Sequence, residues 1–173
     1  MFIRTTVVAS LLCLALPAAT FAQGFTQGDK TLTLSGTGQN DRDFVNFIFS
    51  LEGQLSYFFT DRVEGLIQQN IDWIDVPGSD DDWSGATRAG LRYNWDMGRW
   101  WPFLGVDLGY IYGDRVRDQW VAGPEAGVRY FVNETTFILG QIQYEVFFRN
   151  TSDATDAFDD GRFLYTLGIG FRW

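Results

Sequence analysis

The last ten residues, Leu164-Tyr-Thr-Leu-Gly-Ile-Gly-Phe-Arg-Trp173, decide the fold. Leu167, Ile169 and Phe171 occupy one parity of this stretch, and two glycines and Arg172 occupy the other. Strict alternation of this kind is typical of a β-strand whose two faces meet different surroundings. The fold therefore depends on which of the two faces meets water.

The same alternation recurs along the chain between turn signals. It predicts eight strands near residues 30–38, 44–58, 63–74, 84–95, 102–113, 119–131, 136–149 and 162–173. No linker or low-complexity segment divides them, so we expect one domain. Most of these strands have about twelve residues, and a tilted strand needs roughly 9–11 to cross a bilayer core.

The charged residues indicate which face is inside. Of the 13 basic residues only Lys30 is a lysine, and histidine is absent. A solvated surface normally uses lysine, whereas arginine is preferred where a charge is paired closely with a carboxylate. The polar faces also contain many glycines, which a crowded lumen needs and a solvated face does not. These features favour a closed transmembrane barrel over a soluble barrel or sandwich, because an open sheet edge cannot be satisfied in lipid.

Aromatic residues support this orientation. In an up-and-down barrel they fall into two bands near the strand ends, as expected of membrane–water interfaces. The predicted interface aromatics are Tyr57, Trp73, Tyr93, Trp95, Tyr110, Tyr112, Trp120 and Tyr130.

The N-terminus has the pattern of a secretory signal peptide. Arg4 precedes an apolar stretch and a small-residue exit, which predicts cleavage after Ala22. Residues 1–22 are then the signal peptide, 23–29 a short periplasmic segment and 30–173 the barrel domain. The only cysteine, Cys13, lies in the signal, so the mature chain has no disulfide. The net charge of −9 disfavours nucleic acid as a partner.

At this level the sequence resembles the small eight-stranded outer-membrane β-barrels of bacteria, of the OmpA-transmembrane-domain and OmpX type, over residues 30–173. In that family the last strand carries an insertion signal for the barrel-assembly machinery. Its places are held here by Thr166, Gly168, Phe171 and Trp173. The resemblance implies an outer-membrane location, short periplasmic turns and longer outer loops. It also implies a monomer whose surroundings are the lipid bilayer and lipopolysaccharide.

Charged residues on the polar parities form a predicted lumen network. It comprises Glu52, Glu64, Asp72, Arg88, Arg92, Asp107, Glu125, Arg129, Glu145, Arg162 and Arg172. An eight-stranded barrel is just wide enough to be filled by side chains, so we expect a plug of ion pairs. The alternative is a narrow ion path lined by the same groups.

No catalytic, cofactor or metal site is predicted. The outer-membrane enzymes that this chain resembles in architecture use histidine, and it has none. Acidic residues around 75–82 and 153–160 do not have EF-hand spacing and suggest solvated loops. We therefore expect a non-enzymatic structural or surface-interaction barrel, with a narrow channel as the alternative and a loop-mediated adhesin as a weaker one. Pro124 within the sixth strand predicts a β-bulge.

Overall fold

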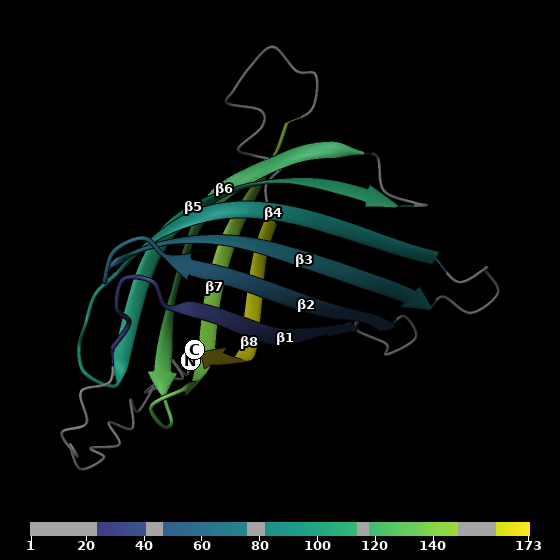
Figure 1. Cartoon of the computed structure of the whole chain (residues 1–173). Coiled ribbons are helices and arrows are strands. Elements are labelled where there is room, and N and C mark those ends of the chain that lie inside the picture. The colour runs from purple at the N-terminus through teal and green to yellow at the C-terminus, as the bar shows by residue number, and fades with distance from the viewer. Residues whose placement is uncertain (1–23, 41–46, 76–81, 114–117, 149–161) are drawn as a thin grey trace, which may run out of the picture.

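The computed structural model describes residues 24–40, 47–75, 82–113, 118–148 and 162–173. These residues form eight antiparallel strands that close into one barrel (Figure 1). The strands are β1 (Lys30–Asn40), β2 (Phe47–Phe58), β3 (Val63–Asp75), β4 (Asp82–Asn94), β5 (Trp100–Gly113), β6 (Gln119–Phe131), β7 (Thr136–Phe148) and β8 (Arg162–Arg172). The predicted fold class is confirmed, and most strand bounds lie within a few residues of the predicted ones.

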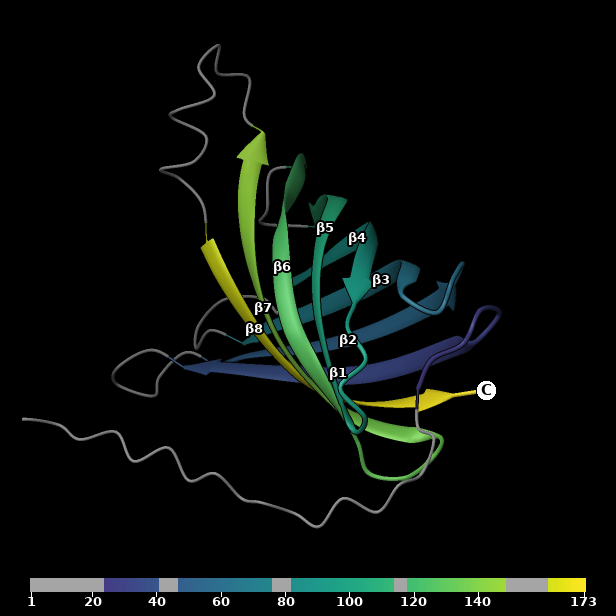
Figure 2. The same ribbon diagram turned by 90° about the vertical axis from the view of Figure 1, so that its left-hand side faces the viewer.

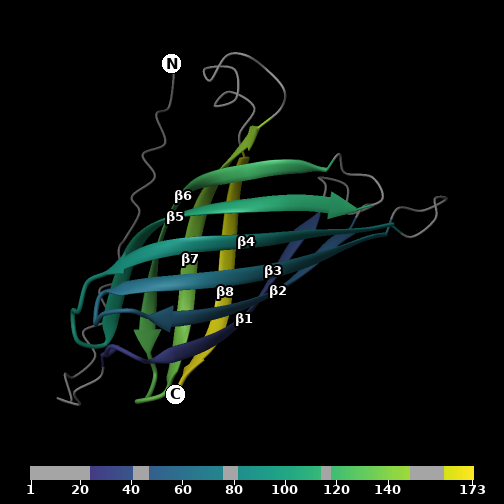
Figure 3. The same ribbon diagram turned by 45° about the horizontal axis from the view of Figure 1, so that its top comes forward.

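Each strand pairs with the next one along the chain, and β8 pairs back with β1. The strands are inclined to the barrel axis, so β2, β3 and β4 cross β7 and β8 steeply in projection (Figures 1 and 3). This tilt is a geometric requirement of closing a sheet of eight strands. Among the described residues no helix is long and apolar enough to cross a membrane.

Burial alternates along the strands in the direction that the composition predicts. In β5 Leu104, Val106 and Leu108 are 55%, 60% and 52% exposed, whereas Phe103 and Asp107 are almost fully buried. Buried polar groups thus lie inside the barrel and large apolar side chains lie outside. A continuous apolar outer surface of this extent is unfavourable in water and is the surface that a lipid bilayer covers.

Glycines of one strand make room for large inward side chains of the next. Across the paired strands, Arg88 faces Gly109, Arg92 faces Gly105, Phe103 faces Gly127 and Phe137 faces Gly170. A Cβ atom at position 105 would lie only 2.8 Å from Cγ of Arg92, and one at position 170 would overlap the Phe137 ring. Small residues opposite large ones let the narrow interior be filled completely.

The predicted bulge at Pro124 is wrong. Pro124 pairs with Val106 of β5 in the same register as the rest of β6. On the other side, pairing with β7 is interrupted between Ala122 and Glu125, and the register is the same before and after this gap. Proline lacks the N–H that the ladder requires, so the pairing has a gap, but no extra residue is inserted.

The strands β1 and β8 meet over a shorter distance than the others. Their pairing covers six positions, from Thr31 with Arg172 to Gly36 with Leu167. Every other neighbouring pair is joined over ten to twelve positions. Beyond Gly36 the two strands separate toward the end of the barrel opposite the C-terminus, which we call the outer end, as Figure 2 shows. The barrel is therefore closed most completely at the end that holds the C-terminus.

Short turns join the strands at this same end, which we call the turn end. In the turn between β4 and β5, Gly98 has φ of 73°, a conformation that glycine adopts without strain. Its N–H donates to Oδ1 of Asp96 at 2.9 Å. In the turn between β6 and β7, Oδ1 of Asn133 accepts from the N–H groups of Thr135 and Thr136. Local hydrogen bonds therefore fix both turns.

Candidate functional site

The lumen contains ion pairs that connect opposite walls. The pair deepest toward the turn end joins Arg129 of β6 to Glu64 of β3. Nη2 of Arg129 donates to both carboxylate oxygens at 2.8 Å. Its Nη1 donates to Oδ1 of Asn94 at 2.7 Å, and both charged side chains are completely buried. A charge removed from water is stable only with such close pairing and additional hydrogen bonds.

A second pair links β4 to β6. Nη2 of Arg92 donates to Oε2 of Glu125 at 2.8 Å. Gln141 of β7 completes a triangle, because it accepts from Arg92 at 2.9 Å and donates to Glu125 at 2.9 Å. The guanidinium also lies 4.5 Å from the ring centroid of Phe103. Three strands are thereby joined through one buried cluster.

A third pair links β4 to β7 and lies closer to the outer end. Nε of Arg88 donates to Oε1 of Glu145 at 2.8 Å. Nε of Arg162 donates to the other oxygen of this carboxylate at 2.7 Å. Arg162 is about half exposed, whereas Arg88 and Glu145 are buried. Glu145 thus accepts from two arginines of different accessibility.

An aromatic cluster closes the lumen at the turn end, and we call it the aromatic floor. It consists of Phe25, Phe58, Trp101, Phe103, Phe131, Phe137 and the aliphatic Leu139. Phe25 is 2% exposed and stacks on Phe58 with ring centroids 4.1 Å apart. The Arg129 guanidinium lies 5.3 Å from the Phe25 ring. A residue before the first strand therefore fills the barrel mouth. Phe25 belongs to the segment 23–29, for which the sequence predicts only a short periplasmic stretch.

Hydrogen bonds hold the segment that carries Phe25 in place. The N–H of Gly28 donates to the carbonyl oxygen of Phe58 at 2.9 Å. The N–H of Gln27 donates to Oδ1 of Asp61 at 2.8 Å. Arg172, predicted as part of the lumen network, lies at this mouth instead. Its guanidinium donates to the carbonyl oxygen of Gly24.

Three predicted lumen carboxylates have no arginine among their hydrogen-bond donors in the described part of the chain. Glu52 accepts from the Ser35 hydroxyl at 3.2 Å. Asp72 accepts from two hydroxyls, of which Ser84 lies at 3.3 Å. Asp107 is 5% exposed, and neither of its carboxylate oxygens has a hydrogen-bond partner among the described residues. The charges of the lumen are therefore not matched one to one.

Several apolar residues lie on the inward parities, among the polar ones, and pack inside the barrel. Leu66, Val121 and Leu139 are all buried, and Val121 belongs to a small cluster with Ala86 and Ile111. The strand register is regular around them, so they reflect lumen packing and no slip in register.

The outer surface carries the aromatic residues in contacting pairs. The ring pairs are Tyr57–Phe59, Tyr93–Trp95 and Trp100–Tyr130 near the turn end, and Trp83–Tyr112 and Tyr110–Trp120 near the outer end. Phe59, Trp83 and Trp100 are not among the predicted interface aromatics, although Trp83 and Trp100 lie on the outward parity of their strands. Trp73 lies at the outer end of β3, where only the backbone is described.

A polar group of three residues interrupts the apolar outer surface. Gln69 of β3 donates to the Tyr112 hydroxyl at 2.9 Å and accepts from the Thr87 hydroxyl at 2.7 Å. The hydroxyls of Thr87 and Tyr112 are 3.2 Å apart. Mutual hydrogen bonding explains how Gln69 is accommodated on a lipid-facing parity.

The four residues of the predicted insertion signal lie on or just after β8. Thr166 and Gly168 face inward, whereas Phe171 and Trp173 are exposed on the outer surface. Backbone hydrogen bonds in both directions join Trp173 to Lys30 at the start of β1. Recognition by an assembly machinery stays a prediction.

No metal-binding site is evident among the described residues. No group of three or more potential metal-ligating side chains occurs within the described ranges. Of the acidic loop residues, Asp75 ends β3 and Asp82 begins β4, whereas the others lie outside those ranges, as do the predicted signal peptide and its cleavage site.

A closed barrel of eight strands with a polar, side-chain-filled lumen and an apolar outer surface defines the class of small transmembrane β-barrels. No protein-family model matches the sequence, and no curated protein matches it. Solved structures of similar fold include several bacterial outer-membrane barrels.

The N-terminal β-barrel domain of OprF from Pseudomonas aeruginosa has a TM-score of 0.59 at 16% identity, covering 87% of this chain and all of that one. OprG from Pseudomonas aeruginosa has a TM-score of 0.58 at 14% identity, covering 87% of this chain and 98% of that one. Neisserial surface protein A has a TM-score of 0.55 at 16% identity, covering 83% of this chain and 94% of that one. At these identities the similarity is one of fold, and the fold is that of bacterial outer-membrane β-barrels.

Proposed function

We propose that this chain is an integral, monomeric barrel of a bacterial outer membrane with a structural or surface-interaction role and a lumen that does not conduct. It catalyses no reaction and needs no cofactor. The observation that carries the proposal is the closure of the lumen by the aromatic floor. The ring of Phe25 contacts those of Phe58, Trp101, Phe131 and Phe137, which supports a lumen that is obstructed at this end.

The cross-lumen ion pairs support the same function. Arg129–Glu64 and Arg92–Glu125 are buried and connect strands that are not neighbours. Opening a path between them would leave charges unpaired in a poorly hydrated interior, which costs several kcal/mol per ion. The ion pairs therefore hold the walls together and obstruct the space between them.

A narrow cation path is the alternative, and one observation favours it. Asp107 lies inside the barrel without a hydrogen-bond partner, and Glu52 and Asp72 accept only from hydroxyls among the described residues. Water or a bound cation would stabilise such carboxylates, and this supports a partly hydrated lumen above the floor.

Single-channel recording in planar bilayers separates the two functions. The proposed plug predicts no stable conductance steps for the folded wild-type barrel. Steps that are cation-selective and are abolished by Asp107→Asn would establish the channel instead. Folding is verified beforehand by the difference in gel migration between unheated and boiled samples.

A further inference from the structure

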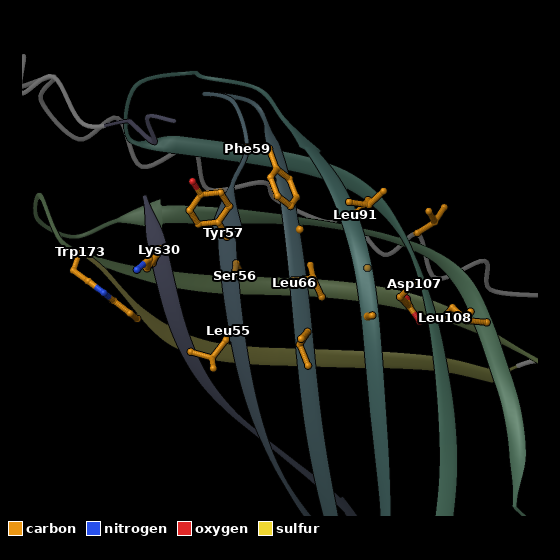
Figure 4. Close-up of a pocket in the computed structure, with 15 residues that line it drawn as sticks. Lys30, Leu55, Ser56, Tyr57, Phe59, Leu66, Leu91, Asp107, Leu108 and Trp173 are labelled. Atoms are coloured by element: carbon orange, nitrogen blue, oxygen red, sulfur yellow. The ribbon is translucent and has the colours of Figure 1, made fainter. Parts of the chain in front are cut away.

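A groove crosses the outer surface of the barrel from β1 to β5. It encloses about 860 Å³ and is lined mainly by apolar side chains. Lys30 and Trp173 lie at one end and Leu108 lies at the other, as Figure 4 shows. Because this surface faces lipid, amphiphiles of the membrane are the molecules that reach the groove.

Two adjacent rows of residues, one along each line of strand pairing, form the groove. One row follows the pairing Lys30, Tyr57, Gly65, Leu91, Val106, and the other follows Leu55, Ile67, Ala89, Leu108. Ala89 provides the depth, and leucine, isoleucine and tyrosine side chains provide the walls. Phe59 bounds the rim, because its ring lies over Gly65, where a Cβ atom would come within 2.6 Å.

The direction of the groove matches one leaflet of a bilayer. It begins at Lys30, the first residue of β1, and reaches Val106 midway along β5. Strands are about 4.8 Å apart, so four spacings give about 19 Å. One leaflet fills about 15 Å of the hydrocarbon core. An inclined path of this length leads from the membrane interface to the bilayer centre, as an acyl chain does.

The charge at the rim identifies the head group. Lys30 is the only lysine of the chain, and it is exposed beside Tyr57 and Trp173. The nearby carboxylates have other partners: Asp29 accepts from the Thr26 N–H, and Asp61 accepts from the Gln27 N–H, both at 2.8 Å. An ammonium group flanked by interfacial aromatics above an apolar groove is complementary to an anionic phosphate with an attached acyl chain.

We propose that this groove is a specific site for an anionic glycerophospholipid of the leaflet that contains the turn end of the barrel. Its phosphate contacts Lys30, and one acyl chain occupies the groove as far as Leu108. The proposal rests on the membrane orientation of the barrel, and it is independent of whether the lumen conducts.

Native mass spectrometry of the purified barrel tests the site, with phosphatidylglycerol as the probe. We expect one lipid retained by the wild type and little retention of phosphatidylcholine. Lys30→Gln lowers retention about fivefold, the effect of one interfacial basic residue. Ala89→Trp fills the groove and abolishes retention.

Two matched variants control for general effects. Arg62→Gln removes a cation from the same rim, where Arg62 contacts the Tyr93 hydroxyl outside the groove lining. Ala126→Trp adds a ring to the outer surface of β6, a strand none of whose residues lines the groove. Both are expected to retain lipid as the wild type does.

Equal loss with Arg62→Gln and Lys30→Gln would show general interfacial attraction and overturn the proposal. Unchanged retention in Lys30→Gln and Ala89→Trp would also overturn it, as would equal retention of phosphatidylcholine. Gel migration confirms that each variant is folded. A conductance measurement on the same samples reports separately on the lumen.

Discussion

The two halves of the lumen accommodate charge in different ways. Near the turns, Glu64 has a bidentate arginine partner above an aromatic floor. Farther from the turns, Asp72 accepts only from hydroxyls and Asp107, near the middle of β5, has no hydrogen-bond partner among the described residues. The seam between β1 and β8 is also paired only in the half near the turns. The barrel is therefore packed as a core at one end and held more loosely at the other, and stability should depend on position accordingly.

The largest effect is expected at the buried pair of the packed half. Arg129→Ala leaves Glu64 charged and unpaired, which costs about 3–5 kcal/mol. Urea unfolding in lipid vesicles, followed by tryptophan fluorescence, measures the loss. The double variant Glu64→Leu/Arg129→Met serves as the control, since it removes both charges and should recover most of the stability. A single variant as stable as the wild type would contradict the assigned importance of this pair.

Truncation of the floor comes next. Phe25→Ala removes a ring that contacts four other aromatic side chains, and a large-to-small change at such a site costs about 3 kcal/mol. The same unfolding assay provides the measurement. If the variant unfolds with the wild-type midpoint, Phe25 does not close the mouth in the membrane.

An added methyl group tests the tightness of packing. Gly170→Ala places a Cβ atom against the Phe137 ring, and overpacking of this kind costs about 1–3 kcal/mol. Gly140→Ala is the matched control, because nothing lies within 4 Å of a Cβ atom there. Equal midpoints for the two variants would mean that Phe137 moves aside freely.

The smallest effect is expected in the outer half. Asp72→Asn keeps an oxygen acceptor for the neighbouring hydroxyls, so the free energy of unfolding should change by less than about 1 kcal/mol. A loss as large as that of Arg129→Ala would remove the contrast between the halves.

Much of the barrel could be predicted from alternation and composition. The strands, their order and the inward direction of the charged parity follow from short-range patterns such as Leu104, Val106 and Leu108 against Asp107. Pairings across the lumen could not be predicted, because Arg129 meets Glu64 only through the tilt and stagger of the closed sheet. The apolar phenylalanine in the polar stretch before β1 was the available signal for the floor, but its neighbours gave no periodicity to place it.

Pro124 shows a limit of local rules. Proline in a strand often marks a bulge, yet here the register is continuous and only a ladder bond is absent. The outward direction of this position puts the ring on the barrel surface, where it displaces no lumen side chain.

The short seam between β1 and β8 has a mechanical consequence. The three cross-lumen ion pairs connect β3, β4, β6 and β7, so they cross-link the wall opposite the seam. The seam itself is joined by six residue pairs. Under a stretching force the wall from β3 to β7 should be stiff, and the seam between β1 and β8 should be compliant. Pulling on Trp173 with an atomic force microscope should separate β8 from β1 before the cross-lumen ion pairs break.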